Sequence, residues 1–139
     1  MLRTLYKHLV LAEVGGVIYV ALELAWRGRS HWTMFILGGV CFAALGLINE
    51  VFPWDMPLWW QIVIGACLIT ALEFMTGCVV NLWLGWTVWD YSSLPGNILG
   101  QICPQFFLLW LLVSLAGIVL DDWLRYWWFG EEWPHYRLL

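Results

Sequence analysis

With 139 residues, of which 63% are hydrophobic and 12% charged, the chain has room for one domain but too few polar side chains to cover a soluble one. Its net charge of −4 excludes nucleic acid as a partner, because binding to phosphates requires a basic surface. The composition therefore predicts an integral membrane protein that lies in a lipid bilayer.

Four apolar stretches are long enough to cross a membrane as helices, since about 20 residues span the ~30 Å hydrocarbon core. They cover residues 9–26, 33–52, 58–82 and 98–120. Tryptophans gather at the ends of these stretches, because indole rings prefer the headgroup level, and only Trp110 falls in the middle of one. We therefore predict a single all-α transmembrane domain over residues 1–139, folded as a four-helix bundle.

The two ends of the chain carry separate predictions. The first stretch could be read as a signal peptide, but Glu13 and Glu23 interrupt it and no clean cleavage site follows, so we expect a retained helix. Residues 121–139 combine charges with tryptophans and are expected to lie along the membrane surface as an amphipathic segment. The alternative is that residues 121–126 simply continue the fourth helix. Both termini are expected on the cytoplasmic side of the cell membrane, because four of the six basic residues would then lie inside.

Three of the predicted helices carry a stripe of polar or small residues that includes a carboxylate. An ionisable side chain inside the bilayer costs about 2.5–3.5 kcal/mol on insertion scales, so each one needs a reason. We predict that Glu23, Glu50 and Glu73 converge on a polar interior or substrate path, with Asn81 on the same helix face as Glu73. The alternative is that these groups only hydrogen-bond between helices and hold the bundle together.

Glu73 is the deepest of these carboxylates, with apolar residues for two turns on either side. We expect it to face the interior, near Glu23 or Tyr19 of the first helix and Gln101 of the fourth. Arg27 follows Glu23 by four residues, which is the spacing and order of a favourable ion pair on a helix.

The segment before the fourth helix is rich in turn-forming and polar residues. Pro95 and Gly96 predict a type II turn, and Asn97 predicts the N-cap of the fourth helix. Pro104 would then kink that helix and free backbone carbonyls near polar side chains. The residues that we add to the predicted polar interior are Asp90, Asn97, Gln101 and Gln105. The alternative is a simple interfacial loop that faces water.

The cysteines lie in apolar runs without the C-x-x-C spacing of a metal or redox site, and they are predicted to be small buried hydrophobic residues. They are Cys41, Cys67, Cys78 and Cys103. We expect no metal, no cofactor and no catalytic set, since the three histidines are far apart in the sequence.

Four segments in the second half of the chain resemble those of a known family. They read Glu73-Phe-Met-Thr-Gly77, Asn81-Leu-Trp-Leu-Gly85, Trp89-Asp-Tyr-Ser92 and Pro95-Gly-Asn-Ile-Leu-Gly-Gln-Ile102. In these segments the chain is similar to the CmpB-like family of small bacterial membrane proteins, the type IV ABC transporter permeases. The resemblance covers most of the chain and is strongest over residues 65–126. It implies a transport component, and because these 139 residues contain no Walker A pattern, the ATPase would be a separate subunit.

Three functions are compatible with these observations. The favoured one is a transport component, a permease or channel-like subunit whose carboxylate stripes line a path. The second is a membrane-embedded enzyme that acts on a lipid or isoprenoid by acid catalysis, with Glu73 or Asp90 as the proton donor. The third is a non-catalytic scaffold or accessory subunit. We also predict a homo-oligomer, because the face formed by Gly39, Ala43 and Gly46 suits close packing against a second copy.

Overall fold

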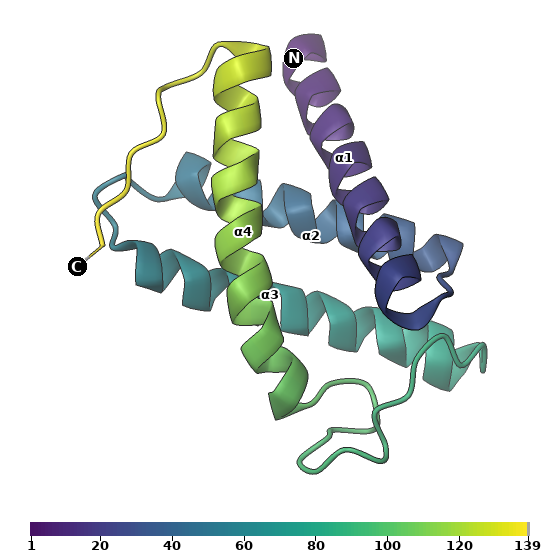
Figure 1. Cartoon of the computed structure of the whole chain (residues 1–139). Helices are drawn as coiled ribbons and strands as arrows, with labels where there is room; N and C mark the ends of the chain where they lie inside the picture. The colour runs from purple at the N-terminus through teal and green to yellow at the C-terminus, as the bar shows by residue number, and fades with distance from the viewer. Residues whose placement is uncertain (139) are drawn as a thin grey trace.

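The computed structural model describes residues 1–138, which form four long helices joined by loops (Figure 1). They are α1 (Leu2–Arg27), α2 (Trp32–Val51), α3 (Leu58–Gly77) and α4 (Pro104–Phe129), and α3 continues directly into a π-helical turn, η1 (Cys78–Trp83). The described residues contain no β-strand. Each helix, with η1 counted in the third, is long and apolar enough to cross a membrane. The predicted all-α, four-span membrane fold is therefore confirmed.

The helices cross one another in two layers. In Figure 1, α1 and α4 lie in front of α2 and α3. α1 packs along α2, and α4 packs on both α3 and α2. The start of α1 meets the end of α4, where the Arg3 guanidinium donates a hydrogen bond to the Phe129 carbonyl oxygen (3.4 Å). We call this end of the molecule the terminal end, and the end that carries the connections 28–31 and 84–103 the loop end.

Local sequence sets the limits of the helices. Gly28 and Gly130 end α1 and α4 with φ of 68° and 64°, a left-handed conformation that glycine adopts without a steric penalty. His31 precedes α2, and its ring nitrogen Nδ1 accepts a hydrogen bond from the Thr33 backbone N–H (3.3 Å). Pro104 occupies the first turn of α4. Backbone N–H groups have no intrahelical acceptor there, so the N–H that proline lacks costs no hydrogen bond.

The fourth helix differs from its predicted range. It begins at Pro104 rather than at residue 98, so the proline starts the helix instead of kinking it. It also runs to Phe129, so that residues 121–129 continue α4, as the alternative interpretation held. Beyond Gly130 the described chain folds back on the molecule, where the Leu58 N–H donates to the Arg137 carbonyl oxygen (2.6 Å). Residue 139, the last of the predicted surface segment, lies outside the described residues.

Glycines allow the closest helix contacts. A Cβ atom on Gly39 would lie 2.6 Å from the Ala12 carbonyl oxygen of α1, and one on Gly16 would lie 2.7 Å from the Phe35 carbonyl oxygen of α2. On α2, Gly46 faces α4 in the same way, since its added Cβ would lie 2.5 Å from an Asp121 carboxylate oxygen. Gly39 and Gly46 are thus covered within one chain, and the predicted use of this face for a second copy is corrected.

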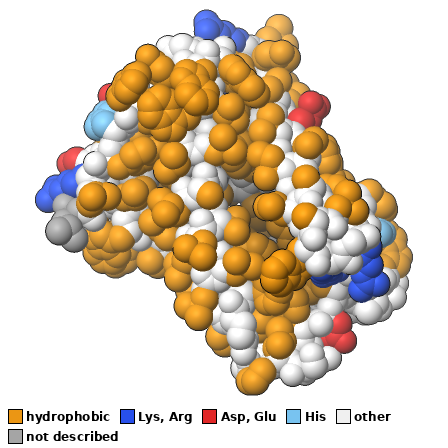
Figure 2. All heavy atoms as spheres, viewed as in Figure 1, with side chains coloured by type: hydrophobic (Ala, Val, Ile, Leu, Met, Phe, Trp, Pro, Cys, Tyr) orange, Lys and Arg blue, Asp and Glu red, His pale blue; other side chains and the backbone are white. Residues whose placement is uncertain are grey.

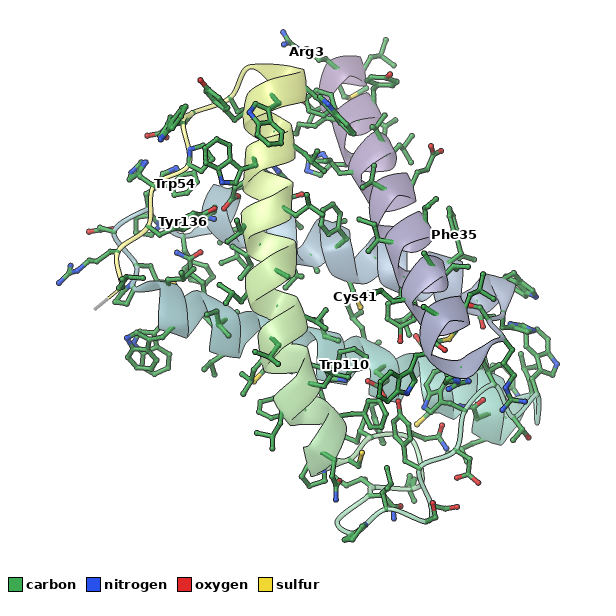
Figure 3. The ribbon with its side chains drawn as sticks, in the orientation of Figure 1. Arg3, Phe35, Cys41, Trp54, Trp110 and Tyr136 are labelled. Atoms are coloured by element: carbon green, nitrogen blue, oxygen red, sulfur yellow. The ribbon has the colours of Figure 1, made fainter. Side chains whose placement is uncertain are left out.

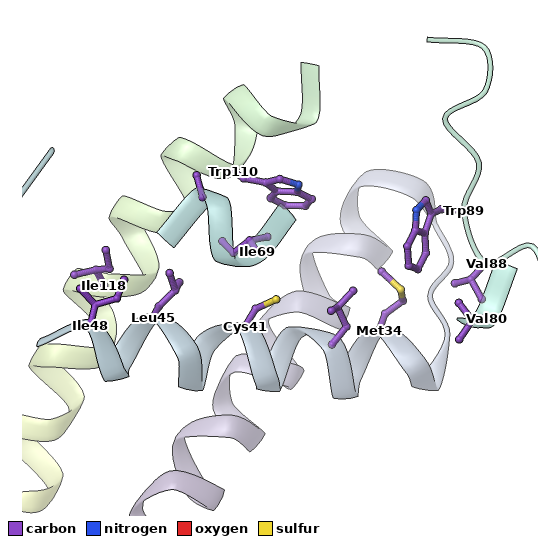
Figure 4. Close-up of a cluster of buried hydrophobic side chains, with 12 residues drawn as sticks. Met34, Cys41, Leu45, Ile48, Ile69, Val80, Val88, Trp89, Trp110 and Ile118 are labelled. Carbon is purple, nitrogen blue, oxygen red and sulfur yellow. The ribbon is translucent and has the colours of Figure 1, made fainter. Parts of the chain in front are cut away.

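The apolar core follows one face of α2 (Figure 4). Leu45 and Ile48 of α2 meet Ile118 of α4, and Cys41 lies near Ile69 of α3 in the same row (Figure 4). Ile118 is fully buried. All four cysteines are free thiols, with Cys41 and Cys103 buried, Cys78 half-buried and Cys67 exposed. The core holds α2 between the other helices and fixes the relative positions of the polar groups described next.

Candidate functional site

Polar side chains between the helices form two separate groups, one at each end of the molecule. The loop cluster consists of Tyr19, Glu23, Glu73, Tyr91 and Trp110. The terminal cluster consists of Lys7, Glu50, Asp121, Asp122 and Arg125. The expectation that Glu50 converges with Glu23 and Glu73 is therefore corrected, because Glu50 ends α2 and lies at the opposite end of the molecule.

Glu73 is the centre of the loop cluster and is only 3% exposed. Trp110 of α4 donates its indole N–H to Oε2 of Glu73 (2.6 Å), and the Tyr91 hydroxyl lies beside the same carboxylate. Tyr19 of α1 reaches this region as well and interacts with both Glu23 and Glu73. Its ring centroid lies 6.4 Å from that of Trp110. Glu73 thus faces the interior, near Tyr19 of α1 and Trp110 of α4, whereas Gln101, the neighbour predicted from the fourth helix, lies in the loop before α4.

Sequence reasoning did not identify Trp110 as the partner of Glu73. The available signal was its position, since Trp110 is the one tryptophan in the middle of a predicted span. An indole N–H buried in an apolar span needs an acceptor, and such a donor indicates a nearby carboxylate or carbonyl. Figure 3 shows Trp110 at the lower end of the opening between α1 and α4.

An ion pair connects α1 to the long loop. Nε of Arg27 lies 3.2 Å from Oε2 of Glu23, which confirms the predicted pair. The same guanidinium donates from Nη2 to the Val88 carbonyl oxygen (3.0 Å). The charge of Glu23 is thus neutralised by Arg27. Arg29, two residues after Arg27, is exposed and makes no ion pair or hydrogen bond within residues 1–138.

Asn81 fastens the loop to the end of the third helix. It lies in η1, and its Oδ1 accepts a hydrogen bond from the Val88 N–H (2.6 Å) while its Nδ2 donates to Oε1 of Gln101 (2.8 Å). Gln101 is buried, and its carbonyl oxygen accepts the Trp89 indole N–H (3.1 Å). Asn81 and Gln101 therefore form hydrogen bonds to each other and to the loop backbone.

The other predicted loop residues have local structural roles. Asn97 does not cap α4, because its side chain donates to the Leu94 carbonyl oxygen (2.8 Å) and accepts from the Gly100 N–H (2.9 Å). Gln105 is exposed and donates to the Pro95 carbonyl oxygen (3.1 Å), so neither residue lines an interior. The predicted turn at Pro95 and Gly96 is present, with φ of 76° at the glycine and a 3.4 Å hydrogen bond from Asn97 N–H to the Leu94 carbonyl oxygen.

Asp90 lies at the surface of the loop end. Its Oδ1 accepts a hydrogen bond from the Ser92 backbone N–H (2.9 Å), which lowers the pKa of the carboxyl group and keeps it ionised. Tyr91, next in the chain, points inward. Burial, followed by the charge of Glu73, raises the pKa of its hydroxyl, which therefore stays protonated and can donate a hydrogen bond.

The terminal cluster is an ion network that joins α1, α2 and α4. Nζ of Lys7 lies 2.8 Å from Oε1 of Glu50, and the Arg125 guanidinium contacts the same carboxylate oxygen. Nε of Arg125 also donates to Oδ2 of Asp121 (2.6 Å), and both of these side chains are almost fully buried. Lys7 further contacts Glu131 of the tail at 3.1 Å. These opposite charges hold three helix ends together.

Asp122 ties the tail to this network. It accepts hydrogen bonds from Nδ2 of Asn49 (2.6 Å) and from the Tyr136 hydroxyl (2.8 Å). Burial, followed by the charge of Asp122, raises the pKa of Tyr136, so its hydroxyl remains a donor. The sequence did not show that Asp121, Asp122 and Arg125 are buried, because a charged stretch rich in tryptophan is also typical of a membrane surface.

Two cavities flank the loop cluster. The α1–α4 crevice has a volume of about 160 Å³ and is lined almost entirely by apolar side chains, with Tyr19 and Trp110 at its wall. Figure 2 shows the mostly apolar surface hollowed between α1 and α4, where Figure 3 places Cys41 and Trp110. The loop cavity, of about 540 Å³, is lined by three charged residues, two aromatic residues and a threonine. They are Arg27, Arg29, Thr87, Trp89, Asp90 and Tyr91.

The histidines have separate surroundings. His8 lies 3.5 Å from Glu50, His31 caps α2, and His135 stacks on Trp54 with ring centroids 4.8 Å apart. Among residues 1–138, no group of three or more His, Cys, Asp or Glu side chains is arranged to hold a metal ion. The chemistry that the loop cluster offers is therefore hydrogen bonding and charge recognition.

Comparison with known proteins gave one family. A family model described as "Putative ABC-transporter type IV" matches residues 21–127. This range includes α2, α3, η1, nearly all of α4 and the whole lining of the loop cavity, but only the last two turns of α1. Tyr19 of the loop cluster therefore lies just before it. Comparisons with curated proteins and with solved structures gave no match.

Proposed function

The chain belongs to this type IV ABC-transporter family, and we propose that it is the membrane-spanning permease component of a transport system, with its substrate site at the loop cluster. The observation that carries the proposal is the buried Glu73, with the half-buried Glu23 nearby, beside an apolar crevice that opens between α1 and α4. A carboxylate retained in an apolar span is typical of substrate and ion pathways.

The arrangement of Glu73 supports transport over acid catalysis. Its carboxylate accepts the Trp110 N–H and lies behind Tyr19 and Tyr91, and it is not among the residues that line either cavity. A proton donor for a lipid substrate would have to reach the bound molecule directly. As a buried hydrogen-bonding centre, Glu73 instead orients the three aromatic side chains that border the two cavities.

A separate ATPase is part of this proposal. The terminal end would be cytoplasmic, because Arg3, Lys7, Arg125 and Arg137 lie near the chain termini. The ion network there connects α1, α2 and α4, so a partner that moves one helix end would act on all three. The network is thus placed to pass a partner's movement into the membrane.

Purification of the full chain from its native membranes in polymer-bounded discs tests the proposal. We expect an ABC-type ATPase to co-purify in fixed stoichiometry and to hydrolyse ATP in a vanadate-sensitive manner. Glu73→Gln should lower ATP turnover while leaving the complex intact, and Gln105→Glu, at the exposed start of α4, serves as the control. A chain that purifies alone under all conditions, or a complex indifferent to Glu73→Gln, would contradict it.

A further inference from the structure

We infer that the loop cavity and the α1–α4 crevice form one binding site for a phospholipid with a zwitterionic, amine-bearing headgroup. This inference rests on the proposed function, since it names the substrate class of the same site. It is carried by two independent observations, the charges left without partners in the loop cavity and the apolar lining of the crevice.

The loop cavity offers one cation and one anion without a counter-charge. Arg27 is already paired with Glu23, but Arg29 is exposed and without a partner within residues 1–138. Asp90 is ionised, and its hydrogen bond comes from a neutral backbone N–H of the loop. A ligand that neutralises both side chains carries a negative and a positive group. Phosphate suits the guanidinium, and a primary ammonium can donate hydrogen bonds to the carboxylate.

Aromatic rings complete the wall of the loop cavity. Trp89 is held in place by its hydrogen bond to the Gln101 carbonyl oxygen, and Tyr91 stacks on Phe106 with ring centroids 4.5 Å apart. Both rings are therefore fixed, and of the two Trp89 is buried while Tyr91 is partly exposed. An ammonium group beside the Tyr91 ring gains cation–π attraction, which adds to its attraction to Asp90.

The α1–α4 crevice supplies a place for the hydrocarbon chain. Its lining comes from all four helices and contains one hydroxyl group, that of Tyr19. Representative apolar side chains are Ile18, Leu22, Phe42, Ile69 and Val113. Such a crevice, open toward the bilayer, excludes water-soluble zwitterions and accepts an acyl chain. The lining therefore favours a lipid over a free phosphoamine as the source of the headgroup.

The two cavities adjoin the same buried carboxylate. Tyr19 and Trp110 line the crevice, Tyr91 lines the loop cavity, and all three side chains interact with Glu73. Trp32 and Trp86, whose rings are 5.8 Å apart, lie at this loop end, at the level where tryptophan meets lipid headgroups. A headgroup in the loop cavity thus places its chain along α1, toward the crevice.

Native mass spectrometry of the purified, delipidated full chain tests the inference without an ATPase. Dioleoyl phosphatidylethanolamine, phosphatidylglycerol and phosphatidylcholine are titrated in turn, with soluble phosphoethanolamine as a fourth probe. We expect the ethanolamine lipid to bind roughly tenfold more tightly than the other two lipids, which corresponds to one charge-assisted hydrogen bond. Soluble phosphoethanolamine should bind far more weakly, because it lacks the chain.

Two substitutions separate the two charges. Arg29→Gln should weaken binding of both the ethanolamine and the glycerol lipid roughly tenfold, because both lose the phosphate partner. Asp90→Asn should weaken only the ethanolamine lipid and erase its preference over phosphatidylglycerol. Arg3→Gln, which removes a charge at the opposite end, should change neither affinity.

A second pair of variants tests the crevice. Ala116→Leu fills it from the α4 side and should weaken binding of every lipid, whereas Ala21→Leu, on an exposed part of α1 outside the crevice, should not. Equal affinity for all three lipids, an unchanged preference in Asp90→Asn, or tight binding of soluble phosphoethanolamine would overturn the inference. Because binding is measured on the chain alone, selective binding without ATPase coupling would contradict only the proposed function.

Discussion

At the scale of single residues, the Glu73–Trp110 contact determines how a carboxylate is kept inside an apolar helix. Oε2 of Glu73 lies 2.6 Å from the Trp110 indole nitrogen, and both side chains are buried. Because both groups are buried, removing one leaves the other with an unmade hydrogen bond. The contact therefore joins α3 to α4 through polar groups, and its contribution to stability requires both side chains.

Substitution of Glu73 should separate hydrogen bonding from charge. Glu73→Gln keeps an acceptor oxygen for Trp110 and should leave the free energy of unfolding nearly unchanged. Glu73→Leu strands the Trp110 and Tyr91 donors and should lower it by about 1–2 kcal/mol. Unfolding in mixed micelles, followed by tryptophan fluorescence, measures both values, with Trp110→Phe as the partner variant. Equal stability of the two Glu73 variants would contradict this assignment.

The residue scale also shows what sequence patterns can and cannot provide. The stripe through Glu73 predicted its inward direction, because a carboxylate in lipid is costly and helix faces follow from spacing. The same reasoning grouped Glu50 with Glu73, which is wrong. A stripe predicts on which face of a helix a residue lies, but not at which depth in the membrane. Glu50 lies at the end of α2, within reach of Lys7 and Arg125, and those two partners are 43 and 75 residues away in sequence.

At the scale of elements, the helix ranges were predicted where apolar runs end at turn residues. The second and third helices match closely, because Pro53, Pro57 and the tryptophans mark real ends. The fourth does not, for two physical reasons. Asn97 bonds within its own loop rather than capping a helix, and Asp121 and Arg125 neutralise each other inside the molecule instead of facing water.

The loop 84–103 should depend on one side chain of η1. Asn81 bonds both to the Val88 N–H and to Gln101, so it holds two parts of the loop against the helix. Asn81→Leu should therefore increase amide hydrogen exchange at residue 88 and over 98–102, while the helices keep their protection. Exchange measured by mass spectrometry in nanodiscs gives this directly, with Leu108→Ala, on an exposed face of α4, as the control. Unchanged protection of the loop would show that backbone contacts alone suffice.

At the scale of the whole molecule, four spans place both chain termini on one side of the membrane. Single cysteines at Ser30 and Ser93, in a background with Cys41, Cys67, Cys78 and Cys103 replaced, should react with an impermeant maleimide from outside intact cells. Both positions belong to the loop end, which the excess of basic residues near the termini predicts to be external. Labelling only after permeabilisation would invert the orientation, and labelling from opposite sides would contradict four spans.

One exposed carboxylate of α1 leads us to predict that the molecule associates with a second copy. Glu13 lies on the exposed surface of α1, six residues beyond Lys7, and makes no hydrogen bond or ion pair within residues 1–138. Facing lipid, an ionised group costs about 2.5–3.5 kcal/mol on insertion scales. A second copy that covers this face removes the cost if it brings a hydrogen-bonding partner. The predicted self-association is thus better placed on α1 than on the glycine face of α2, which Ala12 and Asp121 already occupy.

Photobleaching step counts of labelled chains in liposomes, over a series of protein-to-lipid ratios, measure this association. The native chain should show a concentration-dependent population of two or more copies. Glu13→Leu should raise the monomer fraction at a given dilution, because it strands the partner's polar group, whereas Glu13→Gln retains a hydrogen bond and should change it little. Leu112→Ala, on an exposed face of α4, controls for general lipid effects. If the native chain stays monomeric at every ratio, the predicted self-association is wrong, and the proposed transport path would have to lie within one chain.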